Sequence, residues 1–119
     1  RGDPQSVEEV GRRLDHAEHH VRRAAVEALS AIAEVGDACA VEAVTRRLQH
    51  QEMFIRRFAV RALPEVAGRG NQAAIEAVVA LTEDKDDYVR QAAEEAYQLL
   101  RHDDVAYGDG GYEQQPAAE

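Results

Sequence analysis

The fold of this chain is decided by the stretch VRRAAVEAL, at residues 21–29. A close copy, IRRFAVRAL, occupies residues 55–63, and a more altered copy, VRQAAEEAY, occupies residues 89–97. Successive copies are 34 residues apart in both cases. A constant period of about 20–50 residues is typical of repeat arrays, in which each repeat packs against the next one. The sequence therefore predicts three consecutive structural repeats.

Residue pairs at the same period mark where each repeat begins. These pairs are Gly2-Asp3, Gly36-Asp37 and Gly70-Asn71. Glycine readily adopts the left-handed conformation that follows a helix, and Asp or Asn caps the start of the next helix. Pro4 stands at the first helical position, where a missing N–H costs nothing, so the chain is expected to begin at a repeat boundary. The expected repeats are residues 3–36, 37–70 and 71–102, which form one domain over residues 1–102.

Both halves of each repeat carry the pattern of an amphipathic helix. Apolar residues recur at spacings of three and four, as in Val7, Val10 and Leu14, and therefore share one helical face. Alanines on the second helix allow neighbouring helices to approach closely. Pro64 falls inside the second helix of the second repeat, where we expect it to bend or shorten that helix. The predicted fold is all-α, an α–α superhelix (solenoid) of three helical hairpins.

The composition restricts what the protein can bind. Aromatic residues make up 5% of the 119 residues and there is no Trp, so the core must consist of Ala, Val, Leu and Ile. No apolar run reaches the roughly 20 residues that a transmembrane helix needs, so a soluble chain is expected. The net charge of −9 argues against nucleic acid as a partner. The single cysteine, Cys39, excludes an internal disulfide.

The two ends of the chain carry further information. Residues 103–119 are rich in Gly and contain five acidic residues but no Lys or Arg, which predicts an irregular acidic tail that is disordered on its own. The first residue is Arg1 rather than Met, so we expect a processed protein or a piece of a longer one. The compartment stays open between the cytoplasm and an organelle such as a plastid.

Two columns of charged residues also follow the period of 34. Acidic residues stand at Glu18, Glu52 and Asp86, and arginines stand four residues later at Arg22, Arg56 and Arg90. An acidic residue four positions before an arginine can pair with it on the first turn of a helix. We therefore expect a ladder of ion pairs that sets the register between repeats, although each exposed pair contributes only about 0–1 kcal/mol.

The unit of two helices, with Val-Arg-x-x-Ala-x-x-Ala-Leu opening the second helix, resembles the HEAT repeat. In particular it is similar to the short HEAT-like repeats first described in phycobilisome lyases, over about residues 3–101. Repeats of that variety often carry Asp before the Val-Arg pair, as Asp84 and Asp86 do here, whereas His16 and His50 depart from this pattern. The resemblance supports the solenoid, but HEAT folds serve many roles and do not by themselves define a function.

The sequence does not predict catalysis. A HEAT-repeat enzyme family similar to deoxyhypusine hydroxylase binds iron through His-Glu pairs directly after Val-Arg, and here Arg23-Ala24, Arg57-Phe58 and Gln91-Ala92 occupy those positions. The candidate metal cluster His16, His19, His20 and His50 is interpreted as solvated histidines of turns, because no Cys or second fixed pair completes it. We predict no enzyme activity, no catalytic residue, no cofactor and no metal.

Binding is therefore the expected activity. In a solenoid the second helices line the concave face, and the outward residues there include Arg23, Arg57 and Arg61, with Phe54 beside them. Arginine next to an exposed aromatic residue is typical of protein interfaces, although Phe54 and Phe58 could equally be fillers beside small alanines. The main hypothesis is a scaffold or adaptor that binds one or more proteins within a larger assembly. The alternative is a subunit resembling phycobilin lyases, whose arginines would pair with bilin propionates.

Overall fold

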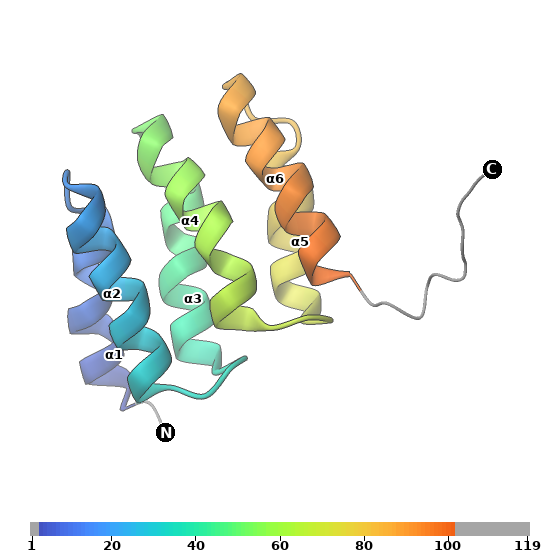
Figure 1. Cartoon of the computed structure of the whole chain (residues 1–119). Helices are drawn as coiled ribbons and strands as arrows, with labels where there is room; N and C mark the ends of the chain where they lie inside the picture. The colour runs from blue at the N-terminus through green and yellow to red at the C-terminus, as the bar shows by residue number, and fades with distance from the viewer. Residues whose placement is uncertain (1–2, 102–119) are drawn as a thin grey trace.

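The chain folds into helical hairpins stacked side by side (Figure 1). The computed structural model describes residues 3–101, and these contain six α-helices and no strand. The hairpins are α1 (Pro4–Gly11) with α2 (His19–Ile32), α3 (Ala38–Arg46) with α4 (Met53–Ala67), and α5 (Gln72–Leu81) with α6 (Asp87–Leu100). Short 3-10 segments at Arg12–Asp15 and Arg47–Gln49 follow α1 and α3. The predicted all-α solenoid is confirmed, while the predicted acidic tail lies outside the described residues.

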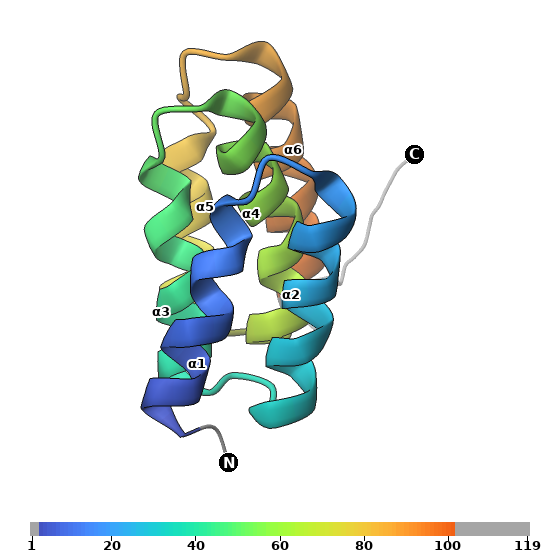
Figure 2. The same ribbon diagram turned by 90° about the vertical axis from the view of Figure 1, so that its left-hand side faces the viewer.

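The helices form two layers. Helices α1, α3 and α5 make one layer, and α2, α4 and α6 make the other (Figure 2). The apolar core fills the space between them, with Leu14, Leu29, Ile55, Leu63 and Leu100 among its fully buried side chains. The three hairpins span residues 4–32, 38–67 and 72–100. None of the helices in residues 3–101 has the length and apolar character that crossing a bilayer demands.

The first helix of each hairpin begins at the residue that the sequence predicts. Asp3, Asp37 and Asn71 are the N-cap residues of α1, α3 and α5. Each side chain accepts a hydrogen bond from the backbone N–H three residues later, at 3.1, 3.0 and 3.0 Å respectively. One otherwise unpaired N–H group is thus satisfied at the start of every first helix.

Gly36 and Gly70 connect each repeat to the following one. Both have a φ angle of 85°, in the left-handed region that favours glycine. The N–H of Gly36 donates to the carbonyl of Val66 at 2.9 Å, and the N–H of Gly70 donates to the carbonyl of Leu100 at 2.6 Å. These acceptors lie near the ends of α4 and α6, so the same hydrogen bond recurs after 34 residues and joins successive hairpins.

Pro64 does not shorten its helix. Helix α4 runs through it and, with 15 residues, is the longest helix in residues 3–101. A proline inside a helix costs about 3 kcal/mol, but Leu63 and Val66 on either side are buried, and burying each such side chain stabilises by about 1.5–3 kcal/mol. Packing in the middle of the stack therefore outweighs the missing hydrogen bond. Of the predicted bend or shortening, the shortening is wrong, and the bend stays a prediction.

Candidate functional site

The second helices α2 and α4 each carry a buried arginine near their first turn. Arg22 and Arg56 are both only 6% exposed. Nη1 of Arg22 donates to the carbonyls of His16 and Ala17 at 2.8 and 3.0 Å. Nη1 of Arg56 donates in the same way to the carbonyls of His50 and Gln51, at 2.9 and 3.0 Å. Each arginine therefore closes the turn of its own hairpin by satisfying carbonyl groups of the loop.

The third arginine of the column behaves similarly, and the predicted ladder needs correction. Nη1 of Arg90 donates to the carbonyl of Asp84 at 2.7 Å, and Nη2 bonds the carboxylate of Asp87. The expected acidic partners are instead the N-cap residues of the second helices, namely Glu18, Glu52 and Asp86. The loop carbonyls would lack hydrogen bonds without the arginines. The need to satisfy these carbonyls therefore determines the partners of the arginines, and the spacing of four residues does not.

An ion pair of Arg56 does join neighbouring repeats, but its acidic partner is not the predicted one. Nε of Arg56 donates to Oδ2 of Asp84 at 2.9 Å, and its Nη2 donates to Oδ1 at 3.0 Å. Both side chains are more than 90% buried, at 7% and 8% exposure. Burial alone would raise the pKa of Asp84, but the hydrogen bonds from Arg56 and from the Asp86 N–H outweigh it and lower that pKa. The result is a two-point ion pair between the second and third repeats.

In the preceding pair of repeats, the residue that corresponds to Asp84 is His50. Asp84 follows Arg56 by 28 residues, and His50 follows Arg22 by the same number. His50 repeats the local role of Asp84. Its Nδ1 accepts the N–H of Glu52 at 3.0 Å, as Oδ1 of Asp84 accepts the N–H of Asp86 at 2.9 Å. An imidazole that accepts in this way brings no negative charge to the arginine. The first repeat therefore keeps the arginine but lacks its carboxylate partner.

Arg22 consequently has no carboxylate counter-ion in the part of the chain that the structure describes. Its Nε atom is buried and has no hydrogen-bond partner among residues 3–101. The guanidinium carbon instead lies 5.3 Å from the ring centroid of Phe54 and 5.0 Å from that of Phe58, within the range of a cation–π interaction. Burial lowers the pKa of Arg22, but a guanidinium stays protonated at neutral pH. The rings stabilise the cation without neutralising it.

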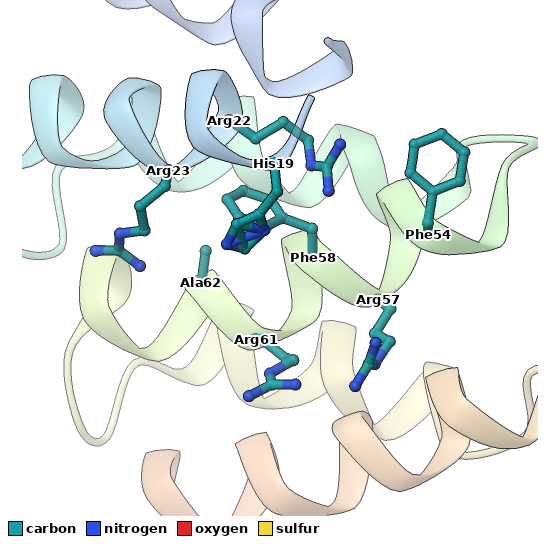
Figure 3. A pocket seen from close by; sticks show the side chains of 8 residues that line it. All are labelled: His19, Arg22, Arg23, Phe54, Arg57, Phe58, Arg61 and Ala62. Carbon is teal, nitrogen blue, oxygen red and sulfur yellow. The ribbon is translucent and has the colours of Figure 1, made fainter. Parts of the chain in front are cut away.

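Arg22 lines a pocket of about 390 Å³ between α2 and α4 (Figure 3). We call it the arginine pocket, and its lining is His19, Arg22, Arg23, Phe54, Arg57, Phe58, Arg61 and Ala62. The His19 ring stands edge-on to Phe58, with centroids 5.6 Å apart. All four residues predicted for partner binding, Arg23, Phe54, Arg57 and Arg61, are brought together here. Sequence reasoning missed Arg22, assigned only to the ladder, as well as His19 and Phe58.

The other arginines of the pocket differ in how far their charges are compensated. Nη2 of Arg23 bonds both carboxylate oxygens of Glu65, at 2.8 and 2.9 Å, and this contact raises the pKa of Arg23. Arg57 lies over the ring of Tyr88, with 5.7 Å to the centroid. Within residues 3–101, neither Arg57 nor Arg61 forms an ion pair with a carboxylate. The pocket is therefore positively charged on a chain whose net charge is −9.

The candidate metal-binding histidines do not form a metal site within residues 3–101. In the part of the chain that the structure describes, no group of three or more His, Cys, Asp or Glu side chains is placed to hold a metal ion. Nδ1 of His16 accepts the N–H of Glu18 at 3.0 Å, which gives this histidine a role in the turn. Cys39 is a partly exposed free thiol.

Stacked two-helix units with a regular pattern of caps and arginines define a helical repeat protein. The comparison with protein families identifies its kind, because the family of HEAT repeats matches residues 30–98, more than half of the chain. The chain therefore belongs to the HEAT-repeat family, whose members are generally non-enzymatic scaffolds for protein interaction. No curated protein matches the sequence.

Proposed function

We propose that this protein is a non-catalytic HEAT-repeat adaptor, and that it binds a protein partner within a larger assembly through the arginine pocket. The observation that carries the proposal is the gathering of four arginines and the 40% exposed Phe54 on one face of α2 and α4. Arginine and aromatic side chains are enriched among the residues that contribute most to interface affinity. The positive pocket on a negative chain also favours one orientation of approach for an acidic partner.

Exposed apolar side chains on the third hairpin also support a role within an assembly. On the last hairpin, Val79, Tyr88 and Leu99 are large apolar side chains that are 46%, 63% and 59% exposed. Large apolar side chains that stay exposed are suited to contact another protein surface. This contact would add to binding at the arginine pocket.

The test is in-cell cross-linking followed by mass spectrometry, with a pair of matched charge reversals. Arg57→Glu with Arg61→Glu changes the pocket, whereas Arg12→Glu with Arg13→Glu makes the same change in charge at two exposed residues between α1 and α2. We expect partner cross-links to α2 and α4 to disappear only in the first variant, with an unchanged helical circular-dichroism spectrum. Equal retention of the partner by both variants would contradict the proposal.

The phycobilin-lyase alternative rests on the same arginines. Two propionates of a bilin could each accept hydrogen bonds from a guanidinium, and Phe54 could contact the pyrrole rings. Mixing the protein with phycocyanobilin should then give a shifted, protein-bound absorption band that the Arg57→Glu/Arg61→Glu variant lacks. An unshifted spectrum would eliminate this alternative and leave the adaptor proposal intact.

A further inference from the structure

The two buried arginines of the second helices provide an internal comparison. Both are 6% exposed, and both use Nη1 to hold two carbonyls of the preceding turn. They differ in the counter-ion. Arg56 has the carboxylate of Asp84, while the position corresponding to Asp84 in the preceding repeat is His50. Arg56 therefore has an anionic partner, whereas Arg22 has none among the described residues 3–101.

The arginine without a counter-ion is also the one that faces a cavity. Figure 3 shows Arg22 reaching from α2 toward α4, between Phe54 and Phe58, at the edge of the arginine pocket. A buried cation that is neither paired nor fully hydrogen-bonded is costly, and the Nε atom of Arg22 has no partner within residues 3–101. A negative group that enters the pocket would offset the charge of this guanidinium, so the free protein already holds a site that favours an anion.

We propose that the arginine pocket binds a carboxylate of an acidic peptide segment, and that this carboxylate becomes the counter-ion of Arg22 as Asp84 is for Arg56. The inference rests on the proposed adaptor function and specifies the chemistry of the partner. The Arg56–Asp84 pair favours a carboxylate, because it shows the same kind of arginine, at the same place in a repeat, holding one with two hydrogen bonds. Arg57 and Arg61, which have no carboxylate partner in residues 3–101, would receive neighbouring acidic side chains of the same segment.

The aromatic residues determine how the segment enters. The ring centroids of Phe54 and Phe58 are 5.3 and 5.0 Å from the Arg22 guanidinium carbon, on either side of it (Figure 3). A guanidinium held in this way loses less conformational entropy when it binds a carboxylate. Glu65 and Glu27 occupy Arg23 at one end of the pocket, with oxygens 2.8 and 3.6 Å from its nitrogen atoms. The acidic segment is therefore expected to extend from Arg22 toward Arg57 and Arg61 rather than toward Arg23.

The experiment places a carboxylate inside the protein to compete with the peptide. His50→Asp reproduces the position of Asp84, and His50→Asn is the matched control, because its side chain can accept the Glu52 N–H but carries no charge. The probe is a fluorescein-labelled peptide of six glutamates, with six glutamines as the uncharged comparison, and binding is followed by fluorescence anisotropy. We expect His50→Asp to weaken binding by about tenfold or more, as expected for losing hydrogen bonds to a charged group. His50→Asn should stay within about threefold of the unaltered protein.

A second measurement observes the arginine itself. In protein labelled with ¹⁵N, the Nε–H signal of Arg22 should shift when the glutamate peptide binds, and it should already be shifted in His50→Asp without peptide. The inference is overturned if the glutamate peptide does not bind, or if His50→Asp binds it as tightly as His50→Asn does. Either result would leave the adaptor proposal intact, provided that the Arg57→Glu/Arg61→Glu variant no longer binds the protein partner in the cross-linking test.

Discussion

Asp84 receives two hydrogen bonds from Arg56 across the boundary between the second and third repeats, at 2.9 and 3.0 Å. The same boundary in the preceding pair of repeats has Arg22 and His50 at the equivalent positions. One interface thus contains a neutralised ion pair, and the other contains a buried cation facing a pocket. This difference between two otherwise similar interfaces connects the stability of the solenoid to its candidate binding site.

Asp84→Asn is expected to destabilise the protein by about 3 kcal/mol, because removing one charge of a buried pair leaves the other without compensation. The measurement is the free energy of unfolding from urea titrations followed by circular dichroism. Asp87→Asn is the control, since this carboxylate also bonds an arginine but is 84% exposed, and exposed pairs contribute about 0–1 kcal/mol. Equal losses in both variants would show that burial does not determine the strength of the Arg56–Asp84 pair.

The same pair predicts a dependence on pH. The pKa of Asp84 is lowered in the folded state, so the unfolded chain binds this proton more readily, and stability rises with pH in that range. The contribution is complete above the unfolded pKa of about 3.9 and is lost as the pH falls through the lower folded value. The stability gap between the unaltered protein and Asp84→Asn should therefore narrow between about pH 5 and pH 2. A gap that stays constant down to pH 2 would contradict this assignment.

The N-caps give a third prediction. Asp37→Ala removes the acceptor for the Ala40 N–H, now bonded at 3.0 Å, and should cost about 1 kcal/mol of stability. Asp37→Asn should cost little, because Asn71 performs the same role at the start of α5, also at 3.0 Å. Urea titrations of both variants test this. A loss in Asp37→Asn as large as in Asp37→Ala would mean that charge, rather than the hydrogen bond, makes this cap effective.

Much of the fold could be predicted from the sequence because it depends on local chemistry. The caps at Asp3, Asp37 and Asn71 and the left-handed Gly36 and Gly70 follow from rules that act over a few residues, and the period of 34 repeats them along the chain. The effect of Pro64 could not be predicted in this way. Whether a proline shortens its helix depends on how much apolar surface its neighbours bury, and that is decided by the other hairpins.

The candidate site was predictable only in part, for the same reason. Arg23, Arg57 and Arg61 follow from helical periodicity, because they point away from the apolar core. The role of Arg22 depends on a residue 28 positions later, across a repeat boundary, and spacing within one helix suggested Glu18 instead. The useful signal was the departure of His50 from the Asp found at position 84. The sequence alone does not show that this departure removes a partner of Arg22, because that depends on the contact between Asp84 and Arg56 across the repeat boundary.

His50→Asp is expected to stabilise the protein, although substitutions at partly buried positions usually destabilise. Arg22 is already desolvated, so a carboxylate at position 50 would gain hydrogen bonds to a charged group while only its own desolvation opposes it. We expect a gain of about 1–2 kcal/mol over His50→Asn, measured by urea titration. Asp15 lies near this position, with Oδ1 3.9 Å from Nε2 of His50, but its carboxylate is paired with Arg47 at 3.1 Å, which limits repulsion. If His50→Asp is no more stable than His50→Asn, then Phe54 and Phe58 already compensate the Arg22 charge, and the pocket has no need of a counter-ion.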